Sequence, residues 1–148
     1  MQMHENYEIT IIGRQTIDHD TDEIKVDTLG DYVEKNGIKY ISYMEYETDA
    51  PYSGRHKILK IEPDGVITML TPGTPTRLVL EKGKRHKCMY DTGAGVLSLG
   101  VFTQTLKHDL SPAGGEIRIG YTLDIDAHLS SFNEILVKLK KCQEKAAE

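Results

Sequence analysis

The sequence predicts an all-β protein, folded as an antiparallel up-and-down barrel of about eight to ten strands. The first observation is that apolar and polar residues alternate with a period of two along most of the chain. The second is that short turns rich in Gly, Asn, Asp and Pro separate these segments. Connections this short join antiparallel neighbours, because a parallel crossover needs a dozen or more residues. A series of so many strands forms a sandwich or a closed barrel, and closure removes the exposed edges.

Length and composition limit the class of protein. The chain has 148 residues, of which 39% are hydrophobic and 28% charged. One core can serve this length, so we expect a single domain over residues 1–148, with a polar tail at 141–148. The net charge of −5 excludes the broad basic field of a generic duplex-DNA binder. No apolar run approaches the roughly 20 residues of a membrane span, and the polar start is not a signal peptide. Two distant cysteines then predict a reduced, cytoplasmic protein.

The N-terminal third predicts two long strands. Residues 7–12 are β-branched and aromatic, and the strand is expected to continue through Gly13 to Ile17. Residues 18–23 form a polar, acidic turn. Residues 24–35 alternate again and end at Asn36-Gly37, where both residues tolerate the positive φ that a type I′ hairpin requires.

A two-residue turn at Asn36-Gly37 fixes the register of the following strand. Lys35 then faces Ile38, and the pairing continues outward through both strands. One face of the hairpin carries Thr28, Gly30, Tyr32, Ile41, Tyr43 and Glu45. The opposite face carries Leu29, Val33, Tyr40 and Met44. Neither face is purely polar, as expected when both sides of a curved sheet are in contact with other groups.

The remaining strands follow the same alternation. They are expected at residues 55–62, 66–70, 76–81, 84–91, 96–106 and 116–126. The C-terminal segment is ambiguous. Ser131 to Glu134 matches a helix capping box, and an apolar stripe at helical spacing follows, which favours a helix over residues 133–140. Ile135, Val137 and Leu139 also alternate with lysines, as in a strand.

The polar residues on one face of the first hairpin form the candidate site. Tyr32, Tyr43 and Glu45, with Thr28 beside them, would point into a barrel if that face is the inner one. A carboxylate buried beside two phenols is a plausible ligand anchor or acid/base group, because burial raises its pKa. A satisfied structural network is the alternative.

Other motifs give weaker signals. Lys84, Arg85 and Lys87 form a basic patch at a hairpin tip, typical of a protected sheet edge or of contact with an anionic partner. The acidic turn has the first spacings of a calcium loop, but Glu23 stands where that loop needs Gly. No catalytic signature, metal motif or cofactor motif stands out.

Scattered positions over nearly the whole chain resemble a known family. They are Gly30-Asp31-Tyr32, Asn36-Gly37, residues 40–45, Tyr90-Asp91-Thr92, Leu97-Ser98-Leu99, Thr103 and Gly120-Tyr121. This pattern resembles the YwiB-like family of small bacterial cytoplasmic proteins of unknown function. The resemblance implies a calycin-like barrel, similar to lipocalins, and a C-terminal segment that forms the last strand. Family members carry Arg-Ser-Gly where this chain has Leu70-Thr71-Pro72-Gly73, and the family provides no site residues to transfer.

Three functions remain open at this stage. The first is binding of a small, partly apolar ligand inside the barrel, with Thr28, Tyr32, Tyr43 and Glu45 as anchors. The second is an enzyme that uses Glu45 and Tyr43 as an acid/base pair. The third is an interaction module with a core filled by side chains. Composition does not decide between a monomer and a homodimer.

Overall fold

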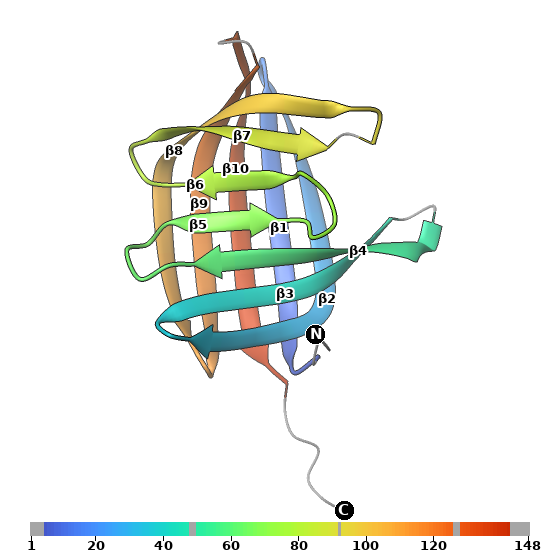
Figure 1. The fold of residues 1–148 in the computed structure, drawn as a ribbon, viewed down its shortest axis with the longest axis vertical. Coiled ribbons are helices and arrows are strands. Elements are labelled where there is room, and N and C mark those ends of the chain that lie inside the picture. Colours follow the sequence, from blue (N-terminus) through green and yellow to red (C-terminus); the bar gives the residue numbers. More distant parts are fainter. Residues whose placement is uncertain (1–4, 48–49, 92, 126–127, 143–148) are drawn as a thin grey trace, which may run out of the picture.

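The computed structural model describes residues 5–47, 50–91, 93–125 and 128–142, whose ten strands close into one antiparallel barrel (Figure 1). Each strand pairs with its neighbours in sequence, and the last strand pairs with the first, so the topology is up-and-down. The strands are β1 (Tyr7–Ile17), β2 (Asp20–Lys35), β3 (Ile38–Glu47), β4 (Ala50–Ile61), β5 (Ile67–Leu70), β6 (Arg77–Leu80), β7 (Arg85–Asp91), β8 (Val96–Ser111), β9 (Gly114–Ile125) and β10 (His128–Lys141). The all-β barrel predicted from the sequence is therefore confirmed. No helix in the described residues has the length and apolar character to cross a membrane.

The two ends of the barrel can be named from the direction in which the strands run. β1 begins and β10 finishes at one end, which we call the terminal end (Figure 1). Odd-numbered strands therefore run from the terminal end to the opposite, distal end, and even-numbered strands run back. Because β4 to β7 cross the long strands β8, β9, β10 and β1 at a steep angle (Figure 1), this polarity gives the end of its own strand to which a residue is nearer.

The hairpin of β2 and β3, which is the first hairpin analysed in the sequence, has the predicted register. Asn36 and Gly37 both have positive φ, 54° and 80°. β2 and β3 pair from Lys35 opposite Ile38 to Gly30 opposite Tyr43. The face that carries Tyr32, Ile41 and Tyr43 is the inner one, since all three are buried. The acidic turn is shorter than expected, because β2 already begins at Asp20.

The C-terminal segment is a strand, which confirms what the family resemblance implies, and the helix that local sequence favours at 133–140 is wrong. β10 pairs with β1 on one side and with β9 on the other, and Val137 lies opposite both Ile11 and Ile117. Val137 and Leu139 are buried while Lys138 is exposed, which is the alternation of a half-buried strand. Closure of the barrel supplies two hydrogen-bonding neighbours that local propensity does not register. From residue 143 on, the expected tail lies outside the described residues.

The terminal half of the barrel is filled by side chains. Its buried core is aliphatic: Ile9, Ile41, Leu59, Ile61, Ile67, Leu80, Ile117, Val137 and Leu139. Two tyrosines close this end. The rings of Tyr7 and Tyr32 meet edge to face with centroids 5.7 Å apart, and the Tyr7 hydroxyl donates to the Pro112 carbonyl at 2.7 Å. Lys39 adds a hydrogen bond to the Leu110 carbonyl at 3.0 Å.

Candidate ligand-binding site

The inner face of the distal half carries polar residues among aliphatic ones such as Leu99 and Val101, whereas the core of the terminal half is largely aliphatic. Its members alternate with outward-facing residues along seven strands or the turns next to them. They are Tyr43, Lys57, Thr71, Tyr90, Thr103, Tyr121, Ser131 and Asn133. All of them are buried except Lys57, which is half-buried, and Tyr90, which is exposed. Buried polar groups are costly unless they find partners, so this concentration marks the candidate site.

A cavity of about 100 Å³ lies against this polar face. Its lining comes from β3, β4, β5, β6 and β7 and from the β5–β6 turn: Tyr43, Lys57, Ile58, Leu59, Met69, Leu70, Thr71, Thr76, Leu78 and Tyr90. Lys57 faces inward because it lies opposite Tyr43 and alternates with buried Leu59 and Ile61. Its ammonium group donates to the hydroxyl of buried Thr71, with Nζ and Oγ1 2.9 Å apart. The cavity thus has one cationic wall and one aliphatic wall.

The phenols of this region are held in their protonated form. Burial, and then the negative charge of Glu45, raise the pKa of Tyr43 above its ordinary value. Burial and the neighbouring Tyr90 raise the pKa of Tyr121 to about 12. At neutral pH both hydroxyls therefore carry their protons and are available as hydrogen-bond donors.

Two further polar groups lie deep in the same half. Thr103 is fully buried, and its hydroxyl has no hydrogen-bond partner among the described residues. Asn133 is buried and donates from its amide to the Ser131 hydroxyl at 2.9 Å. A buried hydroxyl without a partner costs about 1–3 kcal/mol, which is compatible with a group that meets water or ligand.

The structure separates the site residues predicted from the first hairpin. Tyr43 lines the cavity. Tyr32 belongs to the closed terminal end, and its hydroxyl donates to Glu34 at 2.6 Å. Thr28 is half-buried and donates to the Met44 carbonyl at 3.3 Å. Glu45 is exposed, so the expected carboxylate buried between two phenols is wrong. Its place on β3, toward the distal end, brings it to the rim rather than the interior.

Sequence reasoning missed Lys57. A signal was present, because alternation along β4 places Lys57 on the same face as Leu59 and Ile61. The signal is weak because lysine is mostly a solvent-facing residue type, so alternation alone does not assign Lys57 to the interior. Only the partner strands show that its side chain shares the interior with Tyr43 and Thr71.

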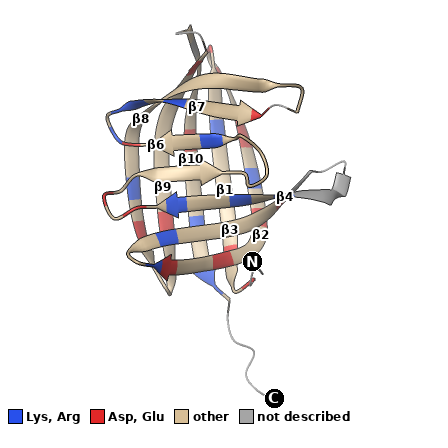
Figure 2. Ribbon diagram, viewed as in Figure 1, with Lys and Arg blue, Asp and Glu red and all other residues tan. Residues whose placement is uncertain are grey.

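The basic patch at the β6–β7 hairpin is largely paired with carboxylates. Lys84 lies 3.2 Å from Glu81 and His86 lies 2.9 Å from the same side chain. These two hydrogen bonds, that of His86 first, lower the pKa of Glu81. Arg85 forms a two-point ion pair with Asp124, and Lys87 is exposed. Figure 2 shows acidic and basic residues together around this connection, so the patch is not a broad field of positive charge.

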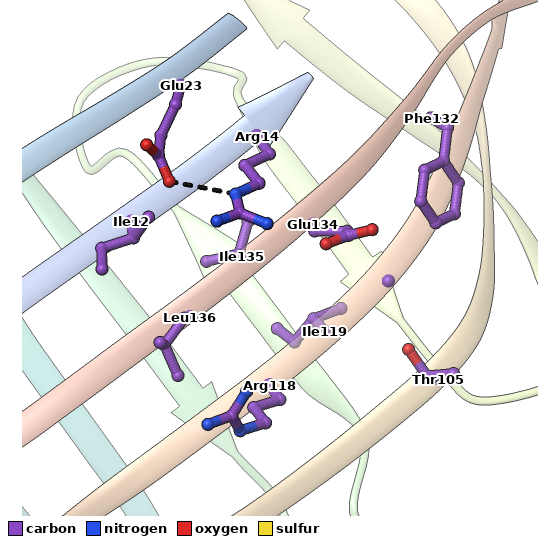
Figure 3. Close-up of a pocket in the computed structure, with 11 residues that line it drawn as sticks. Ile12, Arg14, Glu23, Thr105, Arg118, Ile119, Phe132, Glu134, Ile135 and Leu136 are labelled. Carbon is purple, nitrogen blue, oxygen red and sulfur yellow. Dashed lines mark hydrogen bonds and ion pairs between the residues drawn. The ribbon is translucent and has the colours of Figure 1, made fainter. Parts of the chain in front are cut away.

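A second hollow of about 380 Å³ lies on the outer face of β1, β8, β9 and β10 (Figure 3). Arg14, Arg118, Phe132 and Glu134 line it. Its arginines already have carboxylate partners, since Arg14 contacts Glu23 at 3.0 Å and Arg118 contacts Glu116 at 3.4 Å. The smaller cavity, in contrast, lies on the inner face of the barrel and contains a cation, Lys57, with no carboxylate partner among the described residues. The inner cavity is therefore the stronger candidate.

No group of three or more His, Cys, Asp or Glu side chains is arranged to hold a metal ion within the described part of the chain. The first spacings of a calcium loop come from Asp18, Asp20 and Asp22. Asp18 lies in the β1–β2 turn, and the other two lie in β2. Extended backbone directs successive side chains to opposite faces, which is unlike the inward convergence of a calcium loop.

Comparison with known proteins gives a family and a fold. A sequence model described as a domain of unknown function, DUF1934, matches residues 9–137. None of the curated proteins matches the chain. The crystal structure of the ywiB protein from Bacillus subtilis superimposes with a TM-score of 0.80 over 95% of this chain and 96% of that chain, at 18% sequence identity. At that identity the structural match shows a shared fold.

Proposed function

Because this chain belongs to the DUF1934 family, whose function is unknown, we propose its role from its own geometry: the barrel binds a small, partly apolar molecule in the cavity of its distal half. The family match and the shared fold confirm the YwiB-like resemblance seen in the sequence. The observation that carries the proposal is the cavity on the inner face of the barrel, which has an aliphatic wall and a few polar groups. Small-molecule sites have this composition.

The size of the cavity limits the ligand. An apolar cavity of about 150 Å³ accepts benzene. The cavity here, at about 100 Å³, therefore suits a compact molecule of roughly six heavy atoms or fewer. Buried aliphatic side chains fill the terminal half, so a long lipid does not fit there without rearrangement. This barrel, closed at one end, is comparable to lipocalins, in which eight strands surround one ligand.

The distal rim provides the route of entry. Glu45 and Arg55 are exposed and lie opposite each other where β3 and β4 approach the distal end. In this proposal Glu45 belongs to the rim, while Tyr43 is an interior anchor. Tyr32 and Thr28 have structural partners and are not assigned to the ligand. The two cysteines are free thiols, and on that ground we assign the protein to a reducing, cytoplasmic setting.

The test combines native mass spectrometry with amide NMR spectra. Purified protein is expected to carry a small adduct that is lost on denaturation, or to shift the amide signals of Leu59, Met69 and Leu78 when butanol is added. A Leu78→Phe variant fills the cavity and is expected to abolish both signals. Val33→Phe, on the exposed outer face, is the matched control and leaves them unchanged. A wild-type protein with neither adduct nor butanol response overturns the proposal.

A further inference from the structure

Lys57 is a cation turned into the cavity without a carboxylate to balance it. Its ammonium group donates to Thr71 at 2.9 Å. Within the described residues no ion pair joins it to an Asp or Glu side chain, and Glu45 on the paired strand is exposed. Lys57 is half-buried, and a charge partly removed from water is stabilised when a counter-charge or hydrogen bonds replace the lost hydration.

The polar groups around Lys57 have protons to donate. Thr71 accepts from Lys57, so its hydroxyl proton remains free for a second partner. Tyr43 lines the same cavity, and its hydroxyl forms no hydrogen bond with the described residues. Burial keeps that phenol protonated by raising its pKa. The cavity therefore has hydrogen-bond donors without acceptors next to a positive charge. This arrangement recognises an anionic oxygen.

The aliphatic wall of the cavity restricts the remainder of the ligand. Leu59, Met69 and Leu78 lie side by side on β4, β5 and β6 and line the cavity, and these side chains favour hydrocarbon. A phosphate group would present oxygens to this wall and leave most of them without donors. A carboxylate with a short alkyl chain satisfies both walls and fits the available volume.

We propose that the ligand is a short-chain carboxylate whose two oxygens bind Lys57, Thr71 and Tyr43 and whose alkyl chain packs on Leu59, Met69 and Leu78. This inference rests on the proposed function and adds the chemical class of the ligand. Lys57 supplies the charge that selects a carboxylate over the corresponding alcohol.

The experiment compares the affinity of the protein for butyrate with its affinity for butanol. Amide NMR titrations measure both affinities at constant ionic strength, and sodium chloride replaces sodium butyrate in the reference sample. Wild-type protein is expected to bind butyrate about tenfold or more tightly than butanol, because a charge-assisted hydrogen bond is added. Lys57→Met is expected to lose that preference and still bind butanol, which shows that the cavity remains intact. Lys60→Met is the matched control, because Lys60 lies on the same strand and pairs with Glu62 outside the barrel.

The outcomes separate this inference from the proposed function. Equal affinity for butyrate and butanol in the wild type overturns the carboxylate assignment and leaves the cavity as a site for neutral ligands. Stronger binding of inorganic phosphate than of butyrate also overturns it. The absence of any native adduct together with no response to any of these compounds overturns the proposed function itself. The wild-type comparison decides the inference even if Lys57→Met does not fold.

Discussion

Arg85 on β7 and Asp124 on β9 form a two-point ion pair that passes over β8. The guanidinium Nη2 lies 2.6 Å from Oδ1 of the carboxylate, and Nε lies 3.0 Å from Oδ2. The residue of β8 between them is Gly100, where a Cβ atom would run into both side chains. The absence of a side chain at Gly100 therefore allows the pair to form. The pair links β7 to β9, two strands that do not hydrogen-bond to each other.

This pair predicts a pH-dependent contribution to stability. The hydrogen bond from Arg85 lowers the pKa of Asp124 in the folded state. A lowered folded pKa stabilises the protein above the ordinary Asp value of about 4, and the stabilisation is lost as pH falls through the folded pKa. We expect Asp124→Asn to lower the Tm at neutral pH by about 4 °C or less, since the pair is near the surface. Thermal unfolding at a series of pH values should show the difference disappearing in acid.

The control for that series is Asp109→Asn, because Asp109 is exposed on β8 and outside the described ion pairs. Its Tm should follow that of the wild type across the pH range. A deficit in Asp124→Asn that persists unchanged at the lowest pH would show that the carboxylate acts by packing rather than by charge.

Gly30 is predicted to be the least replaceable glycine of the first hairpin. It lies between Tyr7 on β1 and Tyr43 on β3. A Cβ atom there would meet the Ser42 carbonyl oxygen and the Ile9 side chain, and backbone cannot withdraw as a flexible side chain can. Gly30→Ala should lower the free energy of unfolding by about 2 kcal/mol or more, measured by urea titration.

Gly13→Ala is the matched variant, because Gly13 is also in a strand and a Cβ there has no atom within 4 Å. Its stability should equal or slightly exceed that of the wild type, since alanine loses less conformational entropy on folding. Equal destabilisation by both substitutions would contradict the steric argument at Gly30.

The parts of the fold that the sequence predicted correctly are those governed by local rules. Asn36-Gly37 determines its hairpin because two neighbouring residues with positive φ suffice for the turn. The strand at β10 is different. The same residues satisfy a capping box and an alternating pattern, and pairing with Ile11 and Ile117 decides between them. Those partners are far away in sequence, so local propensity favoured the wrong structure.

The site shows the same limit. Tyr43 could be predicted as an inward residue because the Asn36-Gly37 turn fixes the register of β3, which puts Tyr43 on the same face as Ile41. Glu45 has the same parity, but it lies two residues nearer the end of β3 and is exposed, so parity alone does not decide whether a residue is buried. Lys57 was missed because its role depends on contact with Thr71 across β4 and β5, a relationship that no turn motif specifies.

The two cysteines are predicted to differ sharply in reactivity. Cys88 is only 2% exposed, and its sulfur accepts a hydrogen bond from the Val79 amide at 3.3 Å. Burial raises the pKa of its thiol, so little of the reactive thiolate forms. Cys142 is partly accessible at the end of the chain that the structure describes.

A disulfide reagent should therefore label Cys142 quickly in the native protein, and it should label both thiols in denaturant. Cys142→Ser should remove the fast phase, and Cys88→Ser should leave it unchanged. Rapid labelling of native Cys142→Ser would mean that the β6–β7 region opens more readily than its packing indicates.

The two tyrosines of the first hairpin provide the sharpest test of which end of the barrel binds ligand. Tyr43→Phe removes a donor from the cavity, and Tyr32→Phe removes the hydrogen bond to Glu34 at the closed end. We expect Tyr43→Phe to weaken butyrate binding about three- to tenfold, the effect of one lost hydrogen bond of about 1 kcal/mol. Tyr32→Phe should lower the free energy of unfolding by a similar amount and leave butyrate binding unchanged. Amide NMR titration measures the first effect and urea unfolding the second. Weaker butyrate binding in Tyr32→Phe, with Tyr43→Phe unaffected, would locate the site at the terminal end, where the packed rings of Tyr7 and Tyr32 would have to separate to admit a ligand.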